Sequence, residues 1–132
     1  MKNELGRTIG TGALSLDLRQ HNICFVLPEG ATIANADVTL PGGALIYGKF
    51  TGRIICHEGS LIIPKGSSFA GKAEAQQIYV EGTIRDLPSG EPTTLVGHLL
   101  IAVSEHAIGK ADLASRAFAI HATNFGGRFR TL

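Results

Sequence analysis

The chain has 132 residues, of which 44% are hydrophobic and 17% charged, a balance that fits one folded domain and excludes disorder over most of its length. The formal net charge is +1, with Lys and Arg scattered singly, so there is no basic patch of the kind that binds nucleic acid or anionic lipid. The 17 Gly residues, the absence of Trp and only 6% aromatic residues favour a β-rich protein with many sharp bends.

Residues 1–22 show no sustained hydrophobic period, and we predict that they form a flexible tail or a cap. Their early positive charges are followed by Asp17 and Arg19 instead of an apolar core, which does not indicate a secretory signal. Leu5 and Ile9 would anchor this tail only weakly to a membrane. The longest apolar runs, such as residues 99–103, are too short to span a bilayer. We therefore expect a cytoplasmic protein.

From Ile23 onward, short runs of alternating apolar residues are separated by Gly, Pro, Asn or Asp, a pattern typical of β-strands. A unit in which two apolar residues flank x-Gly-x recurs in this region, beginning at Phe50, Phe69, Val80, Ala107 and Phe125. The first two copies are 19 residues apart, the second and fourth 38 (twice 19), and the last two 18. A shorter motif, two apolar residues separated by one other residue, recurs at similar intervals and begins at Leu61, Ile78, Leu99 and Phe118.

The interval from Ile78 to Leu99 is 21 residues, longer than the 17 residues from Leu61 to Ile78. The longer interval contains residues 86–92, with two prolines that lack the N–H needed by a central strand. We therefore predict that residues 86–92 form a loop bulging from an otherwise regular stack.

A strand pattern that repeats every 17 to 19 residues predicts an all-β fold, a single-stranded β-helix or solenoid with about three short strands per coil. The 110 residues of 23–132, divided by a repeat of ~18, give about six coils. Equivalent residues of successive coils then stack at the strand spacing of ~4.8 Å. The two terminal coils leave backbone groups unpaired, which makes them templates for another chain. The last coil carries our candidate polymerisation interface: Phe118, Phe125 and Phe129.

This succession of coils resembles the bactofilins, a family of bacterial polymer-forming cytoskeletal proteins. The likeness covers residues 23–129 and is carried by residues 27–33, 48–54, 61–75 and 78–84. It implies a right-handed, triangular β-helix that assembles end to end, without nucleotide, into non-polar filaments at the inner face of the cytoplasmic membrane. It also implies a scaffold for cell shape or for cell-wall peptidases and synthases, with no catalytic residue, cofactor or metal. The right hand agrees with the crossover rule for parallel strands.

The main alternative is a β-helical enzyme of the hexapeptide-repeat type, an acyltransferase or a zinc-dependent carbonic anhydrase that works as a trimer. Such enzymes follow a six-residue repeat, whereas this chain repeats every 18 to 19 residues. Five histidines would be the metal ligands, and we expect them instead to be solvated corner residues: His21, His57, His98, His106 and His121.

The other reactive side chains do not show the spacing of a catalytic or metal-binding site. Cys24 and Cys56 lie in apolar stretches without metal-type spacing, and we expect both to be buried as small hydrophobic residues. Four carboxylates are expected to lie singly at outward or corner positions, without an acid–base pair: Glu58, Glu74, Glu81 and Glu105. We also expect Arg128 and Arg130 to face solvent around Phe129. We therefore predict a structural protein and not an enzyme.

Overall fold

A computed structural model of the chain describes residues 8–11, 14–17 and 19–132, with side chains from Arg19 onward. Every regular element in these ranges is a β-strand, so they contain no helix that could cross a membrane. The strands are β1 (Thr8–Thr11), β2 (Leu14–Asp17), β3 (Ile23–Leu27), β4 (Thr32–Leu40), β5 (Gly43–Ile46), β6 (Lys49–Cys56), β7 (Ser60–Ile63), β8 (Ser68–Val80), β9 (Thr83–Ile84), β10 (Thr94–Val103), β11 (Ile108–Ser115), β12 (Phe118–Ile120) and β13 (Asn124–Thr131).

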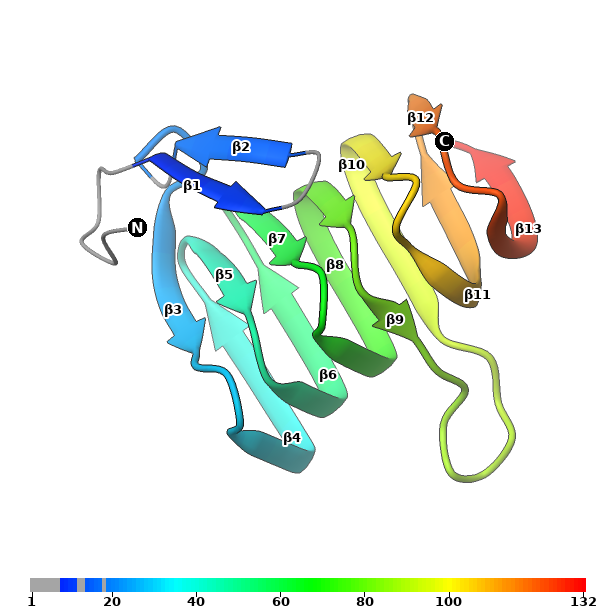
Figure 1. Cartoon of the computed structure of the whole chain (residues 1–132), viewed down its shortest axis with the longest axis horizontal. Coiled ribbons are helices and arrows are strands. Elements are labelled where there is room, and N and C mark those ends of the chain that lie inside the picture. Colours follow the sequence, from blue (N-terminus) through cyan, green and yellow to red (C-terminus); the bar gives the residue numbers. More distant parts are fainter. Residues whose placement is uncertain (1–7, 12–13, 18) are drawn as a thin grey trace.

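From β3 onward the chain winds into a β-solenoid of about six turns, each of about 17 residues (Figure 1). Short strands stack in one parallel ladder, in the order β3, β5, β7, the end of β8, the end of β10 and β12. Longer strands stack in a second ladder. In it, β4 pairs with β6 and β6 with the start of β8, and the ladder then continues through the start of β10 to β11 and β13. The predicted fold class is thus confirmed, and β3 begins at the expected Ile23.

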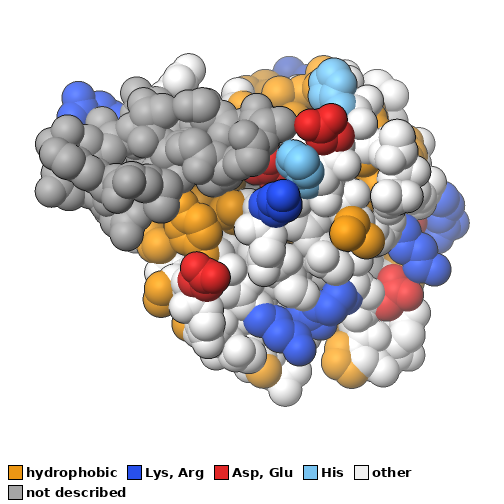
Figure 2. Space-filling model, viewed as in Figure 1, with side chains coloured by type: hydrophobic (Ala, Val, Ile, Leu, Met, Phe, Trp, Pro, Cys, Tyr) orange, Lys and Arg blue, Asp and Glu red, His pale blue; other side chains and the backbone are white. Residues whose placement is uncertain are grey.

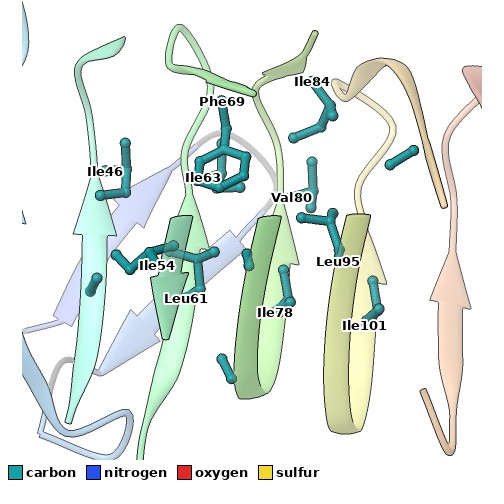
Figure 3. Close-up of a cluster of buried hydrophobic side chains, with 14 of the residues drawn as sticks. Ile46, Ile54, Leu61, Ile63, Phe69, Ile78, Val80, Ile84, Leu95 and Ile101 are labelled. Carbon is teal, nitrogen blue, oxygen red and sulfur yellow. The ribbon is translucent and has the colours of Figure 1, made fainter. Parts of the chain in front are cut away.

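The hydrophobic core fills the interior of the solenoid as columns of side chains that stack from coil to coil (Figure 3). One column contains Leu61, Ile78 and Ile101, which are directly paired between strands and fully buried. A second column begins with Ile33 and continues with Phe50 and Phe69, whose rings stack with centroids 5.4 Å apart and planes 3° apart. Because parallel strands keep equivalent residues in register, each buried side chain packs on its own counterpart in the next coil.

The x-Gly-x motif has a backbone explanation at its central position. Gly71 has a φ of +132°, in the region that favours glycine. A Cβ at this position would also clash with the carbonyl oxygen of Gly52 in the preceding coil. The coils therefore approach too closely at this bend for any larger residue.

The predicted loop at residues 86–92 is confirmed, and it projects from the stack between β9 and β10 (Figure 1). Its base is held by two polar side chains. The Thr93 hydroxyl donates to the Arg85 carbonyl and accepts the Gly71 N–H at 2.9 Å. The Arg85 guanidinium donates to the Ser68 hydroxyl and, at 3.2 Å, to the Phe50 carbonyl two coils away. The insertion is thus fixed to the coils that it interrupts.

The strand register corrects two of the expected equivalences. Ile78 pairs with Ile101 and not with Leu99, and a bulge between Gly97 and Leu100 accounts for one residue of this two-residue shift in the pairing of β10 with β8. Leu99 is therefore an exposed residue and not part of the Leu61 column. In the last coils, Phe125 pairs with Gly109, so the copies of the x-Gly-x unit that begin at Ala107 and Phe125 are not in register.

The N-terminal region contains an antiparallel hairpin of β1 and β2, which pairs Thr8 with Asp17 and Thr11 with Leu14. In the view of Figure 1, the hairpin crosses in front of the first coils. Leu5 lies outside the described residues, and the side chain of Ile9 is likewise not described. The strands of the solenoid proper begin after this hairpin, at β3.

We predict that Gly71→Ala lowers the free energy of unfolding by about 3 kcal/mol, since it adds backbone strain to a steric clash with Gly52. The matched control is Gly126→Ala, because Gly126 has no positive φ and no atom within 4 Å of an added Cβ. Urea unfolding followed by circular dichroism measures both variants. Equal stability losses in the two variants would show that close coil contact does not select glycine at position 71.

Candidate assembly interface

The C-terminal end of the solenoid presents two strands that are paired on one side only. Within the described residues, β12 pairs only with β10, and β13 pairs only with β11. Both strands lie at the end of the stack that is farthest from β3 (Figure 1). Their outer backbone groups have no neighbouring coil, and such an edge can accept a strand from another chain.

The three aromatic residues of the predicted interface all belong to this last coil. Phe118 and Phe129 are in edge-to-face contact, with ring centroids 5.5 Å apart and planes at 67°. Phe129 is 46% exposed, whereas Phe118 and Phe125 are partly buried against the core. The structure thus brings two of the residues together and places the third on the same open coil.

The strands at the N-terminal end of the solenoid are also paired on one side only, as the sequence predicts for both terminal coils, but sequence reasoning named no interface residues there. Within the described residues, β3 pairs only with β5, and β4 pairs only with β6. Leu27 is buried, but four other interior side chains of this first coil are only partly buried: Phe25, Ile33, Val38 and Leu40. The alternation of apolar and polar residues from 36 to 40 is the signal that could have identified this face.

Charged residues of opposite sign lie on the outer faces of the two terminal coils. Asp37 in β4 is 3.5 Å from Arg53, and Arg128 in β13 is 3.3 Å from Asp112. Arg128 and Arg130 are both exposed, as predicted. Figure 2 shows Lys and Arg side chains gathered at the right edge, where β13 lies in the same view.

A lateral strip of the solenoid is buried on both faces. Leu45 and Ile62 alternate with interior residues and so point outward, yet they are almost completely buried together with Ile23. Tyr47 and Tyr79 pack against them. Neighbouring strands of the same sheet do not cover a side chain that points outward. The burial of Leu45 and Ile62 therefore requires another part of the chain to lie over them. Three successive apolar residues, as in Leu61 to Ile63, are the sequence signal of a strand buried on both faces.

The histidines are dispersed among different environments. His21 is buried, and its Nδ1 lies 2.7 Å from the Ser60 hydroxyl, so the expectation of a solvated corner residue is wrong for His21. His98 lies 2.8 Å from a carboxylate oxygen of Glu74, and His106 lies 3.7 Å from Glu105. In the part of the chain that the structure describes, no three His, Cys, Asp or Glu side chains are close enough together to hold a metal ion.

Glu81 lies in the corner after β8, within the outward or corner positions that we expected, and it is buried, with only 1% of its surface exposed. The expectation that Cys24 is buried is wrong. Cys24 is exposed, and it lies where the pairing of β3 with β5 is irregular, between Ile23 and Phe25. Cys56 is buried as predicted. Burial and, to a lesser degree, the nearby Cys24 raise the pKa of the Cys56 thiol to about 12.

Comparisons with protein-family models, with curated proteins and with solved structures find no match for this chain. The candidate interface therefore rests on the geometry of the two open ends.

We predict that the native protein has one readily modified thiol at pH 8. Thiolate is the reactive form, and Cys56 stays protonated at this pH because its pKa is about 12. Titration with a chromogenic disulfide reagent should release one equivalent per chain before unfolding and two afterwards. The Cys24→Ser control should release none before unfolding. Rapid reaction of that variant would show that Cys56 is accessible.

Proposed function

We propose that this protein is a structural, bactofilin-like scaffold whose terminal coils join separate copies end to end, without nucleotide, into a cytoskeletal filament. The observation that carries this proposal is the pair of open ends, each with strands paired on one side and apolar interior residues left partly exposed. In the cell, the filament would support cell shape or hold cell-wall peptidases and synthases at the inner face of the cytoplasmic membrane, as the resemblance implies.

Self-association would give each terminal coil a second neighbouring coil. The eight residues of β13 and the nine residues of β4 offer long edges for pairing with a strand of another copy. Each backbone hydrogen bond gained there contributes about 1 kcal/mol. Burial of a phenylalanine adds roughly 1.5 to 3 kcal/mol when the ring passes from full exposure to full burial, and Phe129 is 46% exposed. The same two forces that hold one coil on the next would thus hold one copy on the next.

The proposed function predicts that the purified protein forms filaments in negative-stain images and that Phe129→Arg reduces them to short oligomers. An arginine would put an uncompensated charge at the centre of the joint, so we expect association to weaken at least tenfold, equivalent to about 1.4 kcal/mol. The far-ultraviolet circular dichroism spectrum should remain β-rich, because Phe129 lies in the last strand.

The matched control is Leu99→Arg, since Leu99 has the same exposed fraction as Phe129 but lies in the bulge of β10, a strand that is paired on both sides and does not form the open edge. This variant should keep its filaments. Filaments that persist in Phe129→Arg would show that assembly does not use the C-terminal coil. Discrete particles of the unmodified protein with stoichiometric bound zinc would contradict the proposal and favour the hexapeptide-type enzyme.

A further inference from the structure

We propose that a hollow on the surface of the solenoid, which we call the corner hollow, binds a neutral saccharide. The hollow lies between residues 20–22, residues 57–60 and residues 76–77, and its volume is about 570 Å³. Small-molecule sites in proteins typically measure about 300 to 1,000 Å³, so this space suits a ligand of one or two sugar rings. Every residue that lines the hollow belongs to the described part of the chain. The inference goes beyond the proposed function and does not depend on it.

Buried contacts fix the shape of the corner hollow. The His21 Nδ1 lies 2.7 Å from the Ser60 hydroxyl, and both side chains are buried. The Ser60 N–H donates to the His21 carbonyl at 3.2 Å, and the His21 ring meets Tyr79 edge to face, with centroids 5.0 Å apart. The segment before β3 is thus tied to the corner between β6 and β7. A site that has its shape before the ligand arrives loses less conformational entropy on binding.

Three side-chain amides that line the hollow are each held by one hydrogen bond. The Asn22 Nδ2 donates to the Glu58 carbonyl at 2.7 Å, and the Gln76 Nε2 donates to another carbonyl of the same corner at 3.1 Å. The Gln77 Oε1 accepts from the Tyr79 hydroxyl at 2.7 Å. Within the described residues, the opposite end of each amide makes no hydrogen bond. Two oxygen acceptors and one NH₂ donor group are therefore oriented and available to a ligand.

The residues that line the corner hollow select the class of ligand. No Lys or Arg is among them, so a phosphate or carboxylate would meet no cation. No Phe, Tyr or Trp is among them either, so a flat aromatic ligand would lack such a ring to stack on. Glu58 is the one charged residue of the lining, and its exposure to water weakens its attraction for a cation. Each hydroxyl of a sugar both donates and accepts hydrogen bonds, which fits a lining that mixes acceptors with donors.

Saturation-transfer NMR and isothermal titration calorimetry of the whole 132-residue chain test this site. The probes are neutral disaccharides that differ in linkage and substitution, namely maltose, cellobiose and N,N′-diacetylchitobiose, with inorganic phosphate as the anionic comparison. We expect saturable binding of at least one disaccharide and no binding of phosphate. Absence of binding by every disaccharide, or tighter binding of phosphate than of any disaccharide, would overturn the proposal.

Two variants place the binding at the hollow. Gln76→Ala removes one available amide oxygen and Asn22→Gly removes the other, and glycine accepts the φ of +55° at position 22. Each should weaken disaccharide binding roughly fivefold, the effect of one lost hydrogen bond. The matched control Asn124→Ala removes an exposed amide of β13 outside the hollow and should keep the affinity. Unchanged affinity in both hollow variants, with β-rich circular dichroism spectra, would show that the sugar binds elsewhere.

The same variants separate this proposal from the proposed function. Gln76 lies in β8, in the middle of the stack, so filaments of Gln76→Ala should persist in negative-stain images while sugar binding weakens. Unmodified protein that binds no sugar but forms filaments would overturn the saccharide site alone. Unmodified protein that binds sugar but forms no filaments would support the site and contradict the proposed function alone.

Discussion

The parallel pairing of each coil with the preceding one fixes where every side chain of the solenoid points. Equivalent residues fall one above the other, so Leu61, Ile78 and Ile101 form a continuous apolar column, and the stacked rings of Phe50 and Phe69 belong to another. The same close stacking excludes a Cβ at Gly71. Each interior coil pairs its backbone and packs its apolar side chains with the coils on both sides. A terminal coil has such a neighbour on one side only.

The proposed assembly is the continuation of that pairing beyond one chain. The ends have what an interior coil has, namely strand edges and apolar columns, and they also differ in charge. Backbone pairing and apolar burial would favour end-to-end contact between copies.

The repeat of the apolar pattern was sufficient to predict the solenoid and the loop at residues 86–92, because side-chain burial in stacked coils repeats with the coil length. The register could not be predicted where β10 has a bulge, since an extra residue on one strand leaves the alternation on either side intact. The burial of Ile62 and His21 depends on what lies over the outer face, which strand periodicity does not specify. Phe118 and Phe129 could be placed on the last coil from the sequence, but their edge-to-face contact required the structure.

Hydrogen exchange at several protein concentrations tests most directly whether the open ladders are the assembly surfaces. If they are, the amides of β3, β4, β12 and β13 should become more protected as concentration rises, while those of β6 and β7 in the middle of the stack stay equally protected throughout. Terminal strands whose protection does not change with concentration, in samples that do form filaments, would contradict the account and place the contacts on the sides of the solenoid.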